Sequence, residues 1–277
     1  MALTLRWKSA TTLPVDGSPL RPETFLGVSV AAAERVVLRV GNRSLPLAEL
    51  FRVDGSGGEE RLILEGSLVH VRRLGAAMER GSLIIDGDAG PQLGSGMRGG
   101  EIEVSGSAGD WCGAEMAGGR IRIGGDSGHF LGAAYPGSRR GMSEGVILVE
   151  GVTGDDAGLL MRRGLIAIRG GSGAGLGRGM IAGTIVSLGG VARSPGAGMK
   201  RGTLVLSGPP PTTLDAILPS FQPAGTFRSP FLGVLRRRLS QWRFPGIDAV
   251  SWHTVARYNG DLVVGGQGEL LVAVGTA

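Results

Sequence analysis

Aliphatic residues recur along the middle of this chain at fixed positions of a 19-residue period. Methionines mark the period, because neighbouring members are 19 residues apart except at one interval of 26 residues. A glycine follows each of them by nine residues. The methionines are Met78, Met97, Met116, Met142, Met161, Met180 and Met199, and the glycines are Gly87, Gly106, Gly125, Gly151, Gly170, Gly189 and Gly208. Such self-similarity is typical of a stacked-repeat fold, here over about residues 60–208 with one insertion of seven residues.

Each unit carries two aliphatic columns that predict a short strand with one buried face. Side chains two residues apart on a strand point to the same side. Four positions before the glycine, starting one unit earlier, lie Leu62, Leu83, Ile102, Ile121, Ile147, Ile166, Ile185 and Leu204. Two positions before it lie Leu64, Ile85, Val104, Ile123, Val149, Ile168, Ser187 and Leu206, of which only the serine is not aliphatic.

Glycine makes up 52 of the 277 residues, and its spacing restricts the fold. The glycines do not recur at every third position, which excludes collagen, and 42% hydrophobic residues are too many for a disordered chain. A 19-residue unit is too short for a strand and a crossover helix. We therefore predict an all-β fold, a right-handed parallel β-helix of about 7–8 coils, roughly 35 Å long. The methionines would lie inside it, and glycines would supply positive φ angles at its corners.

The segments that flank the repeat predict caps. We expect residues 1–60 to form an N-terminal cap, with a strand and turn at 36–42 and a short helix or capping segment at 46–51. Residues 61–208 would form the glycine-rich β-helix. Residues 209–277 form a C-terminal extension. In it, prolines 209–211 end the repeat, residues 212–241 are helical or irregular, and strands at 262–264 and 270–274 form a closing hairpin.

The outer face of the predicted strands is unevenly polar. Three positions before the glycine lie Ile63, Ile84, Glu103, Arg122, Leu148, Ala167, Val186 and Val205. An outward apolar column indicates a covering layer. We expect the chain's own C-terminal segment and another subunit to share that role.

Charge and cysteine content exclude several classes of protein. The net charge of +5 comes from the ends of the chain, and few aromatic residues are available to stack on bases, so nucleic-acid binding is disfavoured. The run 236–238 near Trp242 is either a solvated helix face or a contact for an acidic partner. No apolar stretch is long enough for a membrane span or a signal peptide, which predicts a cytoplasmic protein. The single cysteine, Cys112, excludes an internal disulfide framework and is expected to be a buried thiol.

Most residues with catalytic potential have a simpler structural interpretation. The segment 94–99 fits G-x-G-x-x-G, but the same spacing recurs in several units, so it serves the coil and not one ligand. The histidines His70, His129 and His253 lack metal-ligand spacing. The pairs at 86/88 and 155/156 are expected to be turn residues, with a catalytic carboxylate pair left open.

The seven-residue insertion is the strongest candidate for a contact site. It lies in residues 128–140, which hold His129, Phe130, Tyr135, Arg139 and Arg140. Insertions into stacked repeats become loops on one face, often the binding face. Two interpretations stand side by side: a loop that contacts a partner or an anionic carrier, and a tolerated surface bulge.

Three stretches of the chain resemble one family. The unit 87–106 is similar to the glycine-rich repeats of the C-type subunit of formylmethanofuran dehydrogenase, a repeat type found also at the C-terminus of glutamate synthase. The segments 40–55 and 258–269 are similar to the same subunit. The resemblance covers nearly the whole chain, which favours the stand-alone subunit. Only Lys8 and Lys200 are lysines, and this dominance of arginine favours the methylotroph branch of the family, the formyltransferase/hydrolase complex.

The resemblance implies a non-catalytic scaffold in one-carbon metabolism and formaldehyde oxidation. A formyltransferase subunit would move formyl groups from tetrahydromethanopterin to a methanofuran-type carrier, and an amidohydrolase-like subunit with a metal, zinc, would release formate. A further B-type subunit would complete the hetero-oligomer. This chain would hold no catalytic residue, metal or cofactor. As a separate hypothesis, arginines on its surface would guide an anionic carrier. The alternatives are the equivalent subunit of a tungsten or molybdenum dehydrogenase and, more remotely, a carbohydrate-active β-helix enzyme.

Overall fold

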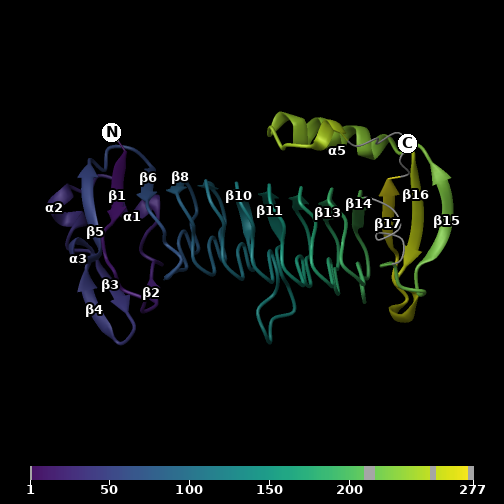
Figure 1. The fold of residues 1–277 in the computed structure, drawn as a ribbon, viewed down its shortest axis with the longest axis horizontal. Helices are drawn as coiled ribbons and strands as arrows, with labels where there is room; N and C mark the ends of the chain where they lie inside the picture. Colours follow the sequence, from purple (N-terminus) through teal and green to yellow (C-terminus); the bar gives the residue numbers. More distant parts are fainter. Residues whose placement is uncertain (1, 209–215, 250–253, 274–277) are drawn as a thin grey trace.

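The computed structural model describes residues 2–208, 216–249 and 254–273. It is mostly β, as predicted, and forms an elongated stack of strands between two differently built ends (Figure 1). The N-terminal elements are β1 (Leu3–Trp7), β2 (Val15–Asp16), α1 (Pro22–Phe25), α2 (Val30–Ala33), β3 (Val37–Val40), β4 (Arg43–Pro46), α3 (Leu47–Leu50) and β5 (Phe51–Gly55). The repeat contains β6 (Arg61–Glu65), β7 (Val71–Arg72), β8 (Ser82–Asp86), β9 (Glu101–Val104), β10 (Ala117–Ile123), β11 (Glu144–Val149), β12 (Leu165–Ile168), β13 (Thr184–Ser187) and β14 (Thr203–Leu206). The C-terminal elements are β15 (Gln222–Phe227), α5 (Pro230–Gln241), η1 (Ile247–Ala249), β16 (Val255–Gly260), η2 (Leu262–Val264) and β17 (Gly268–Ala273).

The repeat strands pair in parallel with their equivalent residues in register. Ile166 on β12, for example, lies between Ile147 on β11 and Ile185 on β13. The order β6–β8–β9–β10–β11–β12–β13–β14 forms the centre of a 13-stranded sheet. A second column of single-residue parallel bridges joins the same units at Leu68, Ala89, Ala108, Ser127, Thr153, Ser172 and Val191. Consecutive units therefore contact each other along two columns.

The two aliphatic columns and the methionine column fill the interior. The seven methionines of the repeat are fully buried, and the aliphatic residues that the strand pattern placed inside are buried as well. Ser187, the exception in its column, is also buried, and its Oγ donates a hydrogen bond to the carbonyl oxygen of Gly190 at 2.6 Å. The polar substitution is tolerated because its hydrogen-bonding group is satisfied.

Glycine serves two separate purposes in the coil. Gly119, six positions before a strand-end glycine, has a φ of +83°, and an added Cβ would lie 2.7 Å from the Cε of Met97 on the previous unit. Gly170, in the strand-end column, has no positive φ, but an added Cβ would lie 2.6 Å from the carbonyl oxygen of Gly151. The predicted corner role thus holds for the first column, whereas Gly170 is required because two backbones approach closely.

The N-terminal cap closes the stack with an antiparallel edge. β1 continues the parallel sheet beside β6, and β5 then pairs antiparallel with β1. The strand and turn predicted at 36–42 correspond to β3 and the turn into β4. Of the two possibilities for 46–51, a short helix or a capping segment, the structure has the helix, α3. Trp7 and Phe51 pack edge to face, with ring centroids 4.9 Å apart.

Helix α5 covers the C-terminal half of the outer sheet face (Figure 1). The outward residues Leu148, Ala167, Val186 and Val205 are buried there, against α5. The helix residues that cover them are spaced three and four apart, as on one helical face, namely Leu232, Leu235 and Leu239. The chain's own C-terminal segment is thus the covering layer for this half. The half that carries Ile63 and Ile84 borders an open concavity.

The closing hairpin is differently placed from the prediction. Strands β16 and β17 pair antiparallel, and β17 extends the parallel sheet beside β14. The predicted strand at 262–264 is wrong, because these residues form the 3-10 helix η2 in the connection. The Asp261 carboxylate caps η2 by accepting from the Val263 N–H at 3.0 Å, and Gly265 ends it in the left-handed conformation. The prolines at 209–211, residues 212–215, His253 and residue 274 lie outside the described residues.

Candidate functional site

The insertion forms the loop between β10 and β11, which projects from one edge of the stack (Figure 1). Its aromatic residues stack on a residue that the sequence reasoning missed, Trp111. The Trp111 ring lies 4.3 Å from that of Phe130, at an interplanar angle of 13°. It lies 5.0 Å from the ring of Tyr135, at 23°. Trp111 precedes Phe130 by one period, so the repeat register was the signal that could have found it.

His129 belongs to a ladder of side chains that cap the backbone of the next unit. The Asp110 carboxylate accepts from the His129 N–H at 2.8 Å, and His129 Nδ1 accepts from the Asp155 N–H at 3.0 Å. The Asp155 carboxylate continues the series by accepting from the Ala174 N–H at 2.7 Å. An Nδ1 that accepts a hydrogen bond carries no proton, so a proton on this ring would sit on Nε2. His129 therefore has a structural role in this geometry.

Basic residues lie beside Tyr135 and at the C-terminal end of the loop. Tyr135 lines a concavity of about 600 Å³ together with Arg39, Arg72 and Arg73. Arg73 lies 3.6 Å from the Asp16 carboxylate. Arg139 and Arg140 are exposed, and within the described part of the chain neither forms an ion pair.

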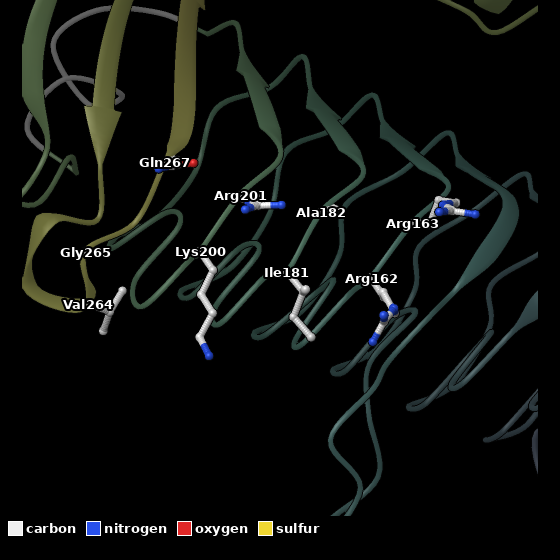
Figure 2. A pocket seen from close by; sticks show the side chains of 9 residues that line it. All are labelled: Arg162, Arg163, Ile181, Ala182, Lys200, Arg201, Val264, Gly265 and Gln267. Atoms are coloured by element: carbon white, nitrogen blue, oxygen red, sulfur yellow. The ribbon is translucent and has the colours of Figure 1, made fainter.

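A second concavity, missed by the sequence reasoning, lies at the edge where the last repeat strands begin (Figure 2). Its volume is about 620 Å³. We define the basic groove by its four cations, Arg162, Arg163, Lys200 and Arg201, which are all exposed.

The repeat places these cations in two rows, because two directly follow Met161 and two directly follow Met199. Ile181 and Ala182 occupy the same positions on the unit between them. Figure 2 shows Ile181 between Arg162 and Lys200, with the three side chains pointing the same way. Two units at about 4.8 Å each separate the rows by roughly 10 Å. The signal in the sequence was the pair of positions after each methionine.

The other candidates have structural surroundings. Cys112 is fully buried in the core, and burial raises the pKa of its thiol to about 12. Asp156 pairs with Arg178 at 3.0 Å, while burial raises the pKa of the carboxyl against the effect of that arginine. Asp155 accepts from the Ala174 N–H at 2.7 Å, so the two adjacent carboxylates have different direct partners.

Three further features bear on the choice of function. Arg238 lies 5.0 Å from the Trp242 ring centroid on the solvent side of α5. Among the described residues, no group of three or more His, Cys, Asp or Glu side chains has the geometry of a metal site. No helix within those same ranges is long and apolar enough to cross a membrane.

Comparisons with known proteins place these features in context. No family model matches the chain. Over 94 residues it is 37% identical to the C-type subunit of molybdenum-containing formylmethanofuran dehydrogenase 1 of Methanothermobacter marburgensis, a match that covers 34% of this chain and 24% of that protein. Over 90 residues it is 36% identical to the C-type subunit of the formyltransferase/hydrolase complex Fhc of Methylorubrum extorquens, which covers 32% and 34%. The matched segments thus span about a quarter of the first curated relative and about a third of the second.

A solved structure extends the match to the full length of both chains. In the crystal structure of the formyltransferase/hydrolase complex (FhcABCD) from Methylorubrum extorquens with methylofuran, one chain superposes with a TM-score of 0.89 at 35% identity. The superposition covers 98% of this chain and 100% of that one. This chain belongs to the family of C-type subunits of these complexes. The family resemblance inferred from the repeat and the two flanking segments is confirmed.

Proposed function

We propose that this C-type subunit is a non-catalytic scaffold of a formyltransferase/hydrolase complex. The observation that carries the proposal is the superposition on a chain of such a complex, which covers 98% of this chain and 100% of that one and therefore extends beyond the repeat. A likeness limited to the glycine-rich repeat would support the fold alone, since one fold serves many functions. The chain would act as one subunit of a hetero-oligomer, without binding nucleic acid or a membrane.

We further propose that residues 61–208 coil as a right-handed parallel β-helix of 7–8 turns, between the cap 1–60 and the extension 209–277. The in-register parallel strands and the second column of bridges support this arrangement. Stiffness would be its contribution to function. Partner subunits held at a fixed separation raise the effective concentration of a tethered carrier at the next site.

The chemistry itself would belong to the partner subunits. The solved complex contains methylofuran, which supports a furan-type formyl carrier for this protein. Tetrahydromethanopterin would supply the formyl group in the formyltransferase subunit. Zinc would serve an amidohydrolase-like subunit that releases formate, in the cytoplasm. The methanogen relative supports a second candidate function, as the equivalent subunit of a molybdenum or tungsten dehydrogenase.

Affinity purification of the tagged chain from its native host, followed by mass spectrometry and metal analysis, tests the proposal. We expect a formyltransferase subunit and an amidohydrolase-like subunit with zinc to be recovered together. Molybdenum or tungsten in stoichiometric amount would identify the dehydrogenase branch instead. Robust hydrolase or lyase turnover by the isolated chain would overturn the scaffold role and favour the carbohydrate-active alternative.

The insertion loop supplies a test of carrier guidance. Arg139 and Arg140 are exposed cations in the same loop as Phe130 and Tyr135 of the aromatic stack, a suitable arrangement for a negatively charged carrier. The paired change Arg139→Ala and Arg140→Ala should lower turnover or assembly of the complex. Unchanged kinetics in an intact complex would assign this loop to the tolerated bulge.

A further inference from the structure

The fold holds three consecutive apolar side chains out in solvent at η2. Leu262 is 47% exposed, Val263 81% and Val264 47%. The Asp261 carboxylate fixes the segment, since Oδ1 accepts from the Val263 N–H at 3.0 Å and Oδ2 from the Gly198 N–H at 2.9 Å. An exposed apolar run of this length is unfavourable unless another surface covers it.

The backbone after η2 is anchored equally firmly to the last unit of the repeat. The Gly266 N–H donates to the Asp261 carbonyl at 2.8 Å, and the Gln267 N–H donates to the Lys200 carbonyl at 2.7 Å. These hydrogen bonds fix the position of η2 relative to Lys200. A surface with fixed geometry loses little conformational entropy on binding.

The basic groove adjoins this apolar segment, because Val264 and Gly265 line it together with the four cations (Figure 2). Within the described ranges, none of the four lies in an ion pair. The nearest acidic position in the register, Glu144 on the unit before Arg163, is not within ion-pair distance of it. Four like charges around one concavity leave a positive potential that an acidic surface would neutralise.

We infer that η2 and the basic groove form one docking surface for a partner subunit that presents carboxylates around an apolar side chain. This inference rests on the proposed function, which supplies the partner subunits. The apolar part favours a protein over a soluble polycarboxylate. A polycarboxylate would use the cations but gain nothing from Val263, whereas a protein interface combines an apolar centre with a charged rim.

The test uses the complex made by co-expressing the tagged chain with the other subunits of its host. One variant carries Val263→Asp, and a second carries Lys200→Glu with Arg201→Glu. Subunit stoichiometry is measured by native mass spectrometry after purification at two salt concentrations. We expect each variant to retain one partner subunit at least tenfold less than the wild type, and we expect added salt to weaken the wild-type contact.

Matched controls separate this surface from a general effect of charge. Val152→Asp changes a different exposed valine, with 48% of its surface accessible, far from the groove in the sequence. Val152 directly follows a strand-end glycine, a position at which other units carry Asp88 and Asp126. Arg35→Glu with Arg43→Glu reverses two exposed arginines on the N-terminal cap. Both controls should assemble like the wild type, and an equal loss in them would overturn the inference.

The remaining outcomes are also decisive. Full assembly of the Val263→Asp complex overturns the docking surface. If the double reversal alone then weakens binding of poly-glutamate, the groove is a polyanion site. A wild-type chain that recovers no partner subunit refutes the proposed function, and this inference with it.

Discussion

The contact between each methionine and a glycine of the next unit makes a sharp prediction about two glycine-to-alanine changes. In Gly119→Ala the new methyl group would lie 2.7 Å from Met97 Cε and 2.8 Å from the Gly100 carbonyl oxygen, at a φ of +83°. In Gly96→Ala the φ is similar, +64°, but no atom lies within 4 Å of the new methyl group. Comparing the two variants therefore separates the free-energy cost of the left-handed backbone conformation from that of the steric clash.

The expected magnitudes differ by the steric contribution. A residue other than glycine in the left-handed region costs about 1–2 kcal/mol, partly offset by about 0.4–1 kcal/mol from the reduced entropy of the unfolded chain. Ala77 and Glu115 occupy the position equivalent to Gly96 with φ values of 55°, so the backbone there tolerates a side chain. We expect Gly96→Ala to lower the free energy of unfolding by about 1 kcal/mol or less. Overpacking adds about 1–3 kcal/mol, which gives about 1–4 kcal/mol for Gly119→Ala and a larger loss than for Gly96→Ala.

Equilibrium urea unfolding followed by circular dichroism measures both values, provided that the slope of the free energy against urea is unchanged. A double-mutant cycle with Met97→Ala identifies the cause. The methionine change alone should cost about 2–5 kcal/mol. The double variant should cost less than the sum by about 0.5–3 kcal/mol, because the new methyl group takes part of the vacated space. Equal losses for the two glycine variants, or strict additivity in the cycle, would refute the reasoning.

Three further predictions concern single side chains. Cys112 is fully buried with a thiol pKa raised to about 12, so it should resist alkylation at pH 8 until urea unfolds the chain; rapid labelling of the folded protein would contradict this. His129→Ala should lower the free energy of unfolding by about 0.5–1.5 kcal/mol, since the Asp155 N–H loses its acceptor, whereas His129→Asn retains one; equal losses would argue against the ladder. Burial would raise the pKa of Asp261, but hydrogen bonds, first that from the Gly198 N–H, lower it overall. The ionised carboxylate therefore stabilises the fold above its unfolded pKa of about 3.9, and this contribution is lost as the pH falls through the lower folded pKa. Asp261→Asn should make the free energy of unfolding less dependent on pH in the acid range. An unchanged dependence on acid pH would contradict this.

The interior of the repeat was predictable because each column is sampled once per unit. A single leucine on a short strand is weak evidence for burial, but aliphatic residues at eight equivalent positions leave one explanation. Ser187 shows the limit of the argument. The pattern placed it inside, yet only the structure shows that the Gly190 carbonyl satisfies its hydroxyl group. The insertion could likewise be located from the period, whereas its stacking on Trp111 depends on the direction in which the loop folds.

Outside the repeat, tertiary contacts decided the structure against local preference. Leu262, Val263 and Val264 have the composition of a strand, but they form a 3-10 turn between β16 and β17. Two long-range contacts hold this turn in place: the Gly198 N–H donates to the Asp261 carboxylate at 2.9 Å, and the Leu262 N–H donates to the Ser220 carbonyl at 3.1 Å. The amphipathic pattern of α5 is clear only when the partner face is known, since its three leucines match the apolar half of the outer column. Such pairings join residues far apart in sequence, and no local pattern contains them.

The features with the clearest potential for function lie at positions where the backbone conformation repeats from unit to unit but the residue type does not. The position after each methionine is occupied in turn by Glu79, Arg98, Ala117, Ser143, Arg162, Ile181 and Lys200. The coil requires only the backbone at this position. The N–H groups of Arg162, Ile181 and Lys200 each donate to the carbonyl of the methionine one unit earlier, at 2.7–2.8 Å, although their side chains differ. A column that the fold does not constrain is free to vary with its surroundings. In this column Arg162 and Lys200 lie on either side of Ile181, and neither has an acidic partner in the described part of the chain. Binding to a partner subunit therefore explains these two cations better than the stability of the coil does.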